Sequence, residues 1–310
     1  MAPSYPLLIS AAELQALRDA RRPLMVFDCS FDLMHPDRGA EQYAALHIAG
    51  AVFADLDRHL SAKHGLPDAH GHVQIAHEAD RPASGGRHPL PSRENFAAWL
   101  CSVGFANDMQ AVVYDRNGAN YCGRLWWMLK WAGHDAVAVL DGGLQAWQAA
   151  GGATRGSAPE ATDHETEPTH FQSNFELRPP LRRLVGSADV QAGLGGTVQT
   201  VVDARAPTRF RGEVEPLDPV AGHIPGALNR PFADNLGPDG RFKSADALRA
   251  EFDALLAGRD PAGVVHQCGS GVSAVPNLLA MEIAGFPPAA LYAGSWSDWC
   301  SDPTRPVAKG

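Results

Sequence analysis

The stretch GVVHQCGSGVSA, from Gly263 to Ala274, carries the strongest structural signal in the sequence. A short β-branched run predicts a strand that ends at Cys268, and a helical pattern from Val275 to Ala284 follows a loop of glycines and serines. Pro276 in the first helical turn and Gly285 after the last one fit the residue preferences of helix starts and ends. This order predicts an α/β domain with Cys268 at the carboxyl end of a strand, where open parallel sheets bind their ligands.

The loop that follows Cys268 has the composition of a site that activates a thiol. A free cysteine has a pKa of about 8.5, and only its thiolate is a good nucleophile. Gly269 and Gly271 let the backbone curl so that successive N–H groups point inward, and the next helix N-terminus adds partial positive charge. Ser270 and Ser273 offer hydroxyl donors to the same place. We therefore predict a reactive nucleophile at Cys268 rather than a buried structural cysteine.

The same order of features occurs in the first half of the chain. The motif HIAGA at 47–51 corresponds to HIPGA at 223–227, and the run AVVYD ending at Asp115 corresponds to VVHQC ending at Cys268. Short β-branched runs alternate with helical patterns in both halves, which is typical of a mainly parallel sheet. The sequence thus predicts two tandem α/β domains, each a mainly parallel sheet flanked by helices.

Length and composition indicate where these domains end. A chain of 310 residues fits about two domains of ~150 residues each. A stretch rich in Pro, Thr, Glu and Ser without apolar periodicity separates the halves. We predict a first domain, a linker and a second domain at residues 1–155, 156–180 and 181–310. The first half also has a histidine-rich insert at 64–82, which we interpret as a solvated loop rather than a metal site.

Charge and cysteine content exclude several classes of protein. The formal net charge of -9 argues against a nucleic-acid or anionic-membrane surface. No run approaches the ~20 apolar residues of a membrane-spanning helix, and the N-terminus lacks the layout of a signal peptide, so we expect a cytoplasmic protein. Five cysteines without CxxC spacing argue against a disulfide framework or a zinc site. We expect neither a metal nor an organic cofactor.

On these residues the chain resembles the two-domain rhodanese family, and within it the 3-mercaptopyruvate sulfurtransferases, whose active loop reads CGSGVT. The resemblance covers nearly the whole chain and includes the motifs DAR at 203–205, RFRG at 209–212, HIPGA at 223–227, WWM at 126–128, DGG at 141–143 and GSWSDW at 294–299. It implies a catalytically silent first domain, with Asp115 in the place of the cysteine. It also implies ping-pong covalent catalysis, in which Cys268 takes sulfur from a small-molecule donor as a persulfide and passes it to a thiol such as thioredoxin or glutathione, or to cyanide.

The resemblance further implies a group of side chains around the cysteine. The family pairs the loop cysteine and serine with an aspartate and a histidine from the first domain, and the matching positions are Asp57 and His88. A carboxylate that orients the Ser270 hydroxyl could relay a proton during sulfur transfer. Both residues also have ordinary interpretations, since Asp57 fits a helix cap or turn and His88 fits a solvated loop.

The donor-binding residues that the resemblance implies are Arg209, Tyr121, Gly269, Gly271, Val272 and Ser273. A guanidinium binds a carboxylate through two parallel hydrogen bonds. The family's second arginine is missing, because the chain reads EPLD at 215–218, where that arginine is expected. Relatives that prefer thiosulfate carry Arg and Lys directly after the cysteine, where this chain has Gly269 and Ser270. The residues favour 3-mercaptopyruvate as the main donor and leave thiosulfate as the alternative.

Two other classes of function stay open at this point. Phosphatases of the same fold clamp phosphate with an arginine six residues after the cysteine, and Ala274 stands at that position. A binding module with two silent domains would need Cys268 to be unreactive, which alkylation by iodoacetamide tests.

Overall fold

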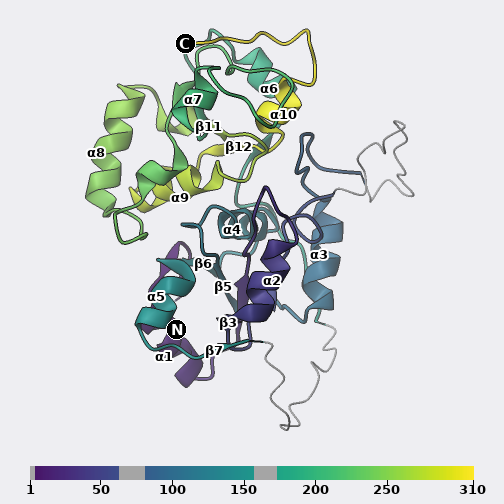
Figure 1. Cartoon of the computed structure of the whole chain (residues 1–310), viewed down its shortest axis with the longest axis vertical. Coiled ribbons are helices and arrows are strands. Elements are labelled where there is room, and N and C mark those ends of the chain that lie inside the picture. The colour runs from purple at the N-terminus through teal and green to yellow at the C-terminus, as the bar shows by residue number, and fades with distance from the viewer. Residues whose placement is uncertain (1–3, 63–80, 157–172) are drawn as a thin grey trace. The chain divides into compact units, whose positions relative to one another are not determined.

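The computed structural model describes residues 4–62, 81–156 and 173–310, which form two compact units (Figure 1). The first unit contains the chain up to Leu60 and Pro91–Leu181. The second contains Pro82–Leu90 and Arg182–Gly310. Residues 82–90, which the sequence places within the predicted first domain, make their contacts with the second unit. The histidine-rich insert lies outside the described residues as far as position 80.

Each unit is built on a five-stranded parallel sheet, and the two sheets share one strand order. The first sheet, in the order β1-β6-β5-β2-β4, consists of β1 (Leu8–Ile9), β6 (Val137–Leu140), β5 (Gln110–Tyr114), β2 (Leu24–Asp28) and β4 (Val52–Phe53). The second, in the corresponding order, consists of β8 (Leu184–Val185), β12 (Ala290–Tyr292), β11 (Val264–Gln267), β9 (Thr200–Asp203) and β10 (Leu228–Asn229). The predicted pair of parallel-sheet domains is confirmed.

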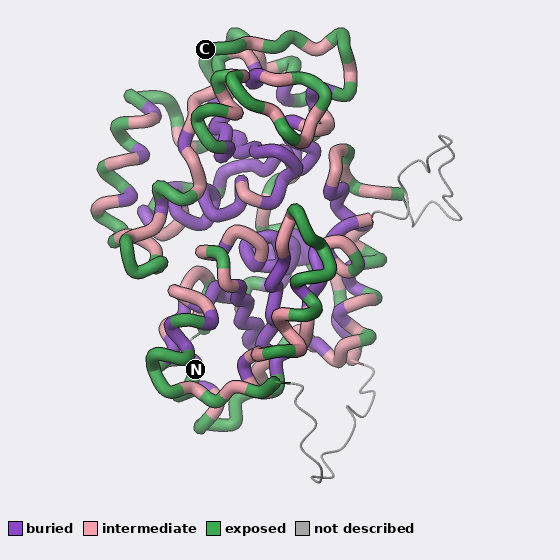
Figure 2. The backbone as a smooth tube through the Cα atoms, in the orientation of Figure 1, coloured by how far each residue is buried: buried purple, intermediate pink, exposed green. Residues whose placement is uncertain are grey.

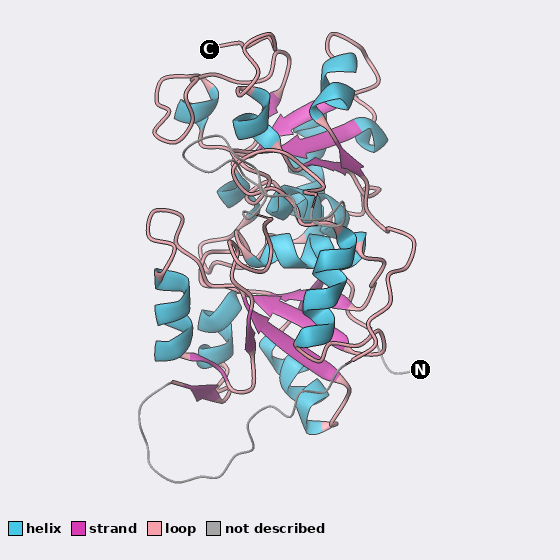
Figure 3. Ribbon diagram, turned by 90° about the vertical axis from the view of Figure 1, so that its right-hand side faces the viewer, coloured by secondary structure: helices cyan, strands magenta, loops and turns pink. Residues whose placement is uncertain are grey.

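Helices flank the strands of both sheets (Figure 3). In the first unit these are α1 (Ala11–Asp19), α2 (Arg38–Ala45), α3 (Arg93–Ser102), α4 (Cys122–Trp131) and α5 (Gly143–Ala149). In the second unit they are α6 (Ser187–Ala192), α7 (Pro207–Phe210), α8 (Ala245–Leu256), α9 (Val275–Ile283) and α10 (Ser295–Trp299), with 3-10 turns η3 (Phe232–Asn235) and η4 (Pro261–Gly263). A small antiparallel pair, β3 (His47–Ile48) with β7 (Thr154–Arg155), completes the first unit. None of the helices in the described part of the chain is long and apolar enough to cross a membrane.

Local sequence explains where the helix next to the cysteine loop begins and ends. Helix α9 starts at Val275 with Pro276 in its first turn, where the missing N–H costs nothing. It ends before Gly285, whose φ of 76° lies in the left-handed region that favours glycine. The prediction of a helix from Val275 to Ala284 is therefore confirmed to within one residue.

The central strands are buried on both faces, as expected for a parallel sheet covered by helices (Figure 2). Every residue of β11 is buried, including His266. Burial, reinforced by the nearby Arg230, lowers the pKa of His266 to about 3. Its Nε2 lies 3.1 Å from the sulfur of Met281. The strand that carries the cysteine loop thus contains a neutral, fully buried imidazole.

Part of the predicted linker packs against the first unit. The Glu176 N–H donates to Asn107 Oδ1 at 2.7 Å, and the Arg178 and Leu181 N–H groups donate to carbonyls of the α4 region at 3.0 Å each. Residues 173–181 therefore belong to that unit, and residues 157–172 lie outside the described part of the chain.

Candidate active site

Cys268 lies directly after β11, at the carboxyl end of the strand, where the sequence predicted it. Its side chain is buried, and its N–H donates to Ser295 Oγ at 3.0 Å. The Cys268 carbonyl accepts from the Trp296 N–H at 3.0 Å, and the Gly269 carbonyl accepts from the Ser297 N–H at 2.9 Å. The first residues of α10 thus hold the backbone of Cys268 and Gly269 in place through hydrogen bonds.

The two glycines of the loop have different roles. Gly271 has a φ of 73°, and a Cβ there would lie 2.7 Å from the Cα of Ala293, so only glycine fits. Gly269 has no positive φ, which corrects the expectation that both glycines supply backbone freedom. A Cβ on Gly269 would instead approach the guanidinium groups of Arg87 and Arg209 at 3.3 and 3.4 Å. Glycine at 269 therefore keeps space open beside the cysteine.

The loop presents several backbone N–H groups that no described residue accepts. These are the N–H groups of Gly269, Ser270, Val272 and Ser273, the first three of them in buried residues. A buried donor without an acceptor costs about 1–3 kcal/mol, so such groups are rare in folded proteins. Successive amides that point into one concavity bind anions. The composition and the unaccepted amides of the loop are therefore those expected of an anion site, and this role stays a prediction.

The corresponding loop of the first unit, which follows β5, binds a carboxylate of its own chain. Asp115 directly follows β5, and its two carboxylate oxygens accept hydrogen bonds from four backbone N–H groups. The donors are Asn117 at 2.8 Å, Ala119 at 3.1 Å, Tyr121 at 2.8 Å and Cys122 at 2.9 Å. The loop after β5 thus binds the carboxylate of its own chain and carries no thiol at that position.

A histidine reaches the loop from the segment Pro82–Leu90. The Nδ1 atom of His88 lies 2.7 Å from Ser270 Oγ, and both side chains are buried. Because the two residues are 182 positions apart in the chain, this hydrogen bond depends on how the segment packs in the second unit. The alternative interpretation of His88 as a solvated loop residue is therefore wrong, and its predicted catalytic role stays a prediction.

Two glycines bring this segment close to α10. A Cβ on Gly85 would lie 2.6 Å from Asp298 Oδ1, and a Cβ on Gly86, whose φ is 86°, would lie 2.8 Å from Ser297 Oγ. The next residue, Arg87, donates its N–H to the same serine oxygen at 3.0 Å. The sequence SGGRH thus combines a close backbone approach with the delivery of a charged and a titratable side chain to the loop.

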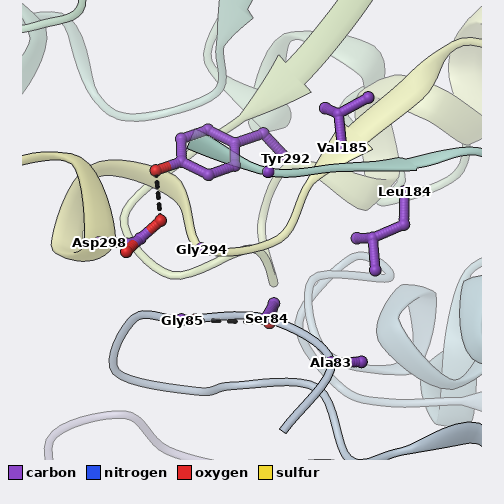
Figure 4. Close-up of a pocket in the computed structure, with 9 residues that line it drawn as sticks. Ala83, Ser84, Gly85, Leu184, Val185, Tyr292, Gly294 and Asp298 are labelled. Atoms are coloured by element: carbon purple, nitrogen blue, oxygen red, sulfur yellow. Dashed lines mark hydrogen bonds between the residues drawn. The ribbon is translucent and has the colours of Figure 1, made fainter. Parts of the chain in front are cut away.

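Figure 4 shows this contact from the side of a small pocket of about 190 Å³. Ser84 and Gly85 lie on one side, and Gly294 and Asp298 lie on the other. Asp298 accepts a hydrogen bond from the hydroxyl of Tyr292 at 2.6 Å, which fixes the carboxylate that Gly85 approaches. The pocket thus lies where the segment Pro82–Leu90 packs against the rest of the second unit.

Arg209, in the RFRG motif, is held by two acidic residues. Its Nη2 lies 2.7 Å from Glu215 Oε1 and 3.2 Å from Asp218 Oδ2, and its Nε lies 3.2 Å from Glu215 Oε2. Burial raises the pKa of the Asp218 carboxyl, although the nearby Arg87 and Arg209 oppose the shift. The segment in which the second arginine of the family was expected therefore supplies carboxylates that orient Arg209.

Asp57 and Tyr121 belong to the first unit. Asp57 is half-buried in a turn, where its N–H donates to Asp55 Oδ1 at 2.8 Å. Tyr121 precedes α4, its ring packs edge-on against Phe31, and burial raises the pKa of its hydroxyl. Their roles in catalysis and donor binding stay predictions.

Sequence reasoning missed the residues that support the loop. Ser295 and Ser297 were noticed only as part of the GSWSDW motif, and Arg87 was not singled out. The signal that could have found Arg87 is the pair of glycines directly before it, since paired glycines mark a close approach of backbones. All five cysteines are unpaired, and no group of three or more metal-ligating side chains occurs in the part of the chain that the structure describes.

Comparison with known proteins identifies relatives over nearly the whole chain. A sequence profile of the rhodanese-like domain matches residues 10–150 and 187–302. A probable 3-mercaptopyruvate sulfurtransferase of Pseudomonas aeruginosa is 46% identical over 304 residues, which cover 98% of each chain. A putative thiosulfate sulfurtransferase of Mycobacterium tuberculosis is 40% identical, with 98% of this chain and 97% of that protein covered. The two names differ in the sulfur donor.

The solved structures that match have the same architecture. The structure of a 3-mercaptopyruvate sulfotransferase from Escherichia coli superposes with a TM-score of 0.71 at 29% identity, and the match covers 94% of this chain and 98% of that one. A 3-mercaptopyruvate sulfurtransferase from Leishmania major gives a TM-score of 0.73 at 28% identity, covering 96% of this chain and 75% of that one. Sequence and fold therefore point to the same relatives.

Proposed function

Because the chain belongs to the rhodanese-like family and is a sulfurtransferase, we propose that it takes sulfur from 3-mercaptopyruvate, holds it as a persulfide on Cys268 and passes it to a thiol or to cyanide. The predicted roles of the loop residues follow from this chemistry. Thiosulfate is the alternative donor and is expected to react more slowly.

The observation that carries the persulfide proposal is the set of unpaired amides around Cys268. A persulfide formed on the thiol extends into the concavity lined by the N–H groups of Gly269, Ser270 and Val272. In the first unit the corresponding concavity binds the carboxylate of Asp115 through four amides, so a loop of this shape accommodates an anion at the end of its strand. Such donors stabilise negative charge most strongly where water is excluded.

The first half-reaction transfers one sulfur atom. The Cys268 thiolate attacks the thiol sulfur of 3-mercaptopyruvate and forms the S–S bond, while the C–S bond of the donor breaks. The electron pair of that bond leaves with the carbon as the enolate of pyruvate, and a proton converts it to pyruvate. In the second half-reaction an acceptor thiolate or cyanide attacks the outer sulfur and releases the Cys268 thiolate.

Ser270 and His88 are suited to supply the proton that the leaving enolate needs. Ser270 is two residues after Cys268, and the Nδ1 atom of His88 lies 2.7 Å from the Ser270 hydroxyl oxygen. A hydroxyl hydrogen-bonded to a protonated imidazole donates a proton to the enolate and recovers one from the ring, which is general acid catalysis. The proton that the donor thiol loses as the persulfide anion forms restores the imidazolium. Burial of both groups keeps bulk water from competing for the enolate.

Two features favour 3-mercaptopyruvate over thiosulfate as the donor. No basic side chain follows Cys268 within the loop, where Gly269 and Ser270 stand. The Arg209 guanidinium lies 3.4 Å from the position that a Cβ on Gly269 would occupy, which suits the single carboxylate of a 2-oxo acid beside the thiol.

We also propose a cytoplasmic location, because five unpaired cysteines fit a reducing compartment.

A side-by-side steady-state assay tests the proposal. The purified protein is given 3-mercaptopyruvate or thiosulfate, with cyanide or dithiothreitol as the acceptor, and kcat/KM is compared. A clear preference for 3-mercaptopyruvate is expected. A preference for thiosulfate would overturn the donor assignment, and activity with neither donor would favour a binding module. Mass spectrometry after incubation with donor alone is expected to find one additional sulfur atom on the Cys268 peptide.

A further inference from the structure

Two guanidinium groups lie beside the Cys268 loop, and one of them comes from the segment Pro82–Leu90. A Cβ built on Gly269 would lie 3.3 Å from Arg87 Nη2 and 3.4 Å from Arg209 Nη1. Both nitrogens therefore lie beside the residue that follows the nucleophile, no more than about 7 Å apart. Arg87 is in the same compact unit as the loop, with its N–H bonded to Ser297.

A buried carboxylate fixes the two arginines as a pair. Asp218 Oδ1 accepts from Arg87 Nη1 at 2.6 Å, and Asp218 Oδ2 accepts from Arg209 Nη2 at 3.2 Å. The Asp218 side chain is only 4% exposed, whereas those of Arg87 and Arg209 are 26% and 18% exposed. The acid thus engages one terminal nitrogen of each guanidinium group, Nη1 of Arg87 and Nη2 of Arg209, and leaves the other terminal nitrogen of each beside Gly269.

The donors that face the loop have no acceptor among the described residues. Neither Arg87 Nη2 nor Arg209 Nη1 donates a hydrogen bond there, and Arg87 Nε is a buried nitrogen without a partner. Unsatisfied donors of a charged group are costly, so this arrangement suits a ligand whose oxygens complete the set. Two forked guanidinium groups around one small space match a carboxylate better than a neutral group.

We propose that Arg87 is a donor-recognition residue, which binds the donor carboxylate together with Arg209 and so selects small 2-oxo acids that carry a thiol. This inference rests on the proposed function and deepens it. One carboxylate oxygen binds Arg87 Nη2 and the other binds Arg209 Nη1. The segment 215–218, which lacks an arginine, contributes Asp218 instead, and this acid positions a guanidinium from elsewhere in the chain.

The location of the pair fits the length of such a donor. The guanidinium groups lie beside Gly269, whose Cα is one peptide unit, about 3.8 Å, from that of Cys268. A three-carbon acid with its carboxylate on the arginines can therefore direct the thiol on its third carbon toward the cysteine sulfur.

Alkylation of Cys268 tests the proposal independently of sulfur transfer. Iodoacetate and iodoacetamide both form an S–C bond with the thiolate and release iodide, but only the first carries a carboxylate. The ratio of their rate constants, measured by mass spectrometry of the Cys268 peptide, therefore separates anion recognition from thiol reactivity. We expect Arg87→Gln to lower this ratio about tenfold, the effect of losing one charge-assisted hydrogen bond. Arg87→Lys, which keeps the charge and the pairing with Asp218, is expected to give an intermediate ratio.

Arg211→Gln is the matched control, because Arg211 belongs to the same motif but forms an exposed ion pair with Glu213. Its ratio is expected to equal that of the wild type. An unchanged ratio in Arg87→Gln would overturn the inference whether or not 3-mercaptopyruvate is the donor. Wild-type protein that releases no pyruvate from 3-mercaptopyruvate would instead overturn the proposed function, and the alkylation ratio would still report carboxylate binding. In an active wild type, kcat/KM of Arg87→Gln should fall with 3-mercaptopyruvate and much less with the carboxylate-free thiol mercaptoacetone.

Discussion

Replacing His88 separates proton transfer from structural support at the Cys268 loop. His88→Asn places a side-chain oxygen or nitrogen near the position of Nδ1, so the hydrogen bond to Ser270 persists, but the amide cannot shuttle a proton. His88→Ala removes both functions. The comparison is informative because His88 Nδ1 and Ser270 Oγ are 2.7 Å apart and both side chains are buried.

The expected magnitudes follow from this geometry. General acid catalysis contributes about 10²–10⁴-fold, so we expect both variants to lose at least 10²-fold in kcat, which corresponds to about 2.7 kcal/mol of barrier. His88→Ala also leaves the Ser270 hydroxyl buried without its partner, which lowers the free energy of unfolding by about 1–3 kcal/mol before any cavity effect. His88→Asn should stay within about 1 kcal/mol of the wild type, because its amide replaces that partner.

Pyruvate release in a single turnover, with 3-mercaptopyruvate and no acceptor, measures the half-reaction in which the enolate is protonated. Urea unfolding measures stability in parallel. His47→Asn is the matched control, since His47 Nδ1 lies 2.7 Å from the Tyr43 carbonyl in the first unit, and wild-type rates are expected. Wild-type rates and an unchanged pH profile in His88→Asn would refute the acid–base role and leave His88 as a positioning residue only.

Further predictions concern the nucleophile, the strand beneath it and the loop backbone. Cys268→Ser should lower transfer by at least about 10³-fold with an unchanged urea midpoint, because a serine oxygen is a far weaker nucleophile; appreciable turnover would count against the persulfide. His266 is neutral in the fold with a pKa of about 3, so between about pH 6.5 and 3 the unfolded chain binds a proton that the native chain does not. This proton uptake lowers the free energy of unfolding as the pH falls below about 6.5 and has no effect above it, so His266→Leu should lose about 2 kcal/mol less than the wild type between pH 7 and 5 in urea unfolding; parallel losses would contradict this. Gly271→Ala should lower the free energy of unfolding by about 1–3 kcal/mol more than Gly285→Ala, because both have positive φ but only Gly271 faces the Ala293 backbone; equal losses would show that the contact relaxes.

The elements that local sequence could predict are those whose signals lie within a few residues. Alternating β-branched and helical runs identified the two parallel sheets, and the position of Pro276 and Gly285 predicted helix α9. The same local pattern put Cys268 at the carboxyl end of a strand. These predictions succeeded because backbone preference and burial period are properties of short segments.

The parts that local sequence missed depend on residues far apart in the chain. His88 and Ser270 are 182 positions apart, and Arg87 and Asp218 are 131 positions apart, so no periodicity or spacing connects them. The resemblance to a family suggested His88, but it gave no reason to consider Arg87. The composition of the loop also led us to interpret Gly269 as a source of backbone freedom, whereas its missing side chain leaves room beside two guanidinium groups.

The sequence by itself determined that this chain forms two α/β domains with a cysteine loop in the second and an acidic counterpart, Asp115, in the first. Only the tertiary structure decided that residues 82–90 join the second unit, that the N–H groups of Gly269, Ser270 and Val272 have no acceptor among the described residues, and that Asp218 orients two arginines. The physical reason is that hydrogen-bond satisfaction and charge pairing depend on which distant groups reach a site. That depends on the packing of the whole unit rather than on any one segment.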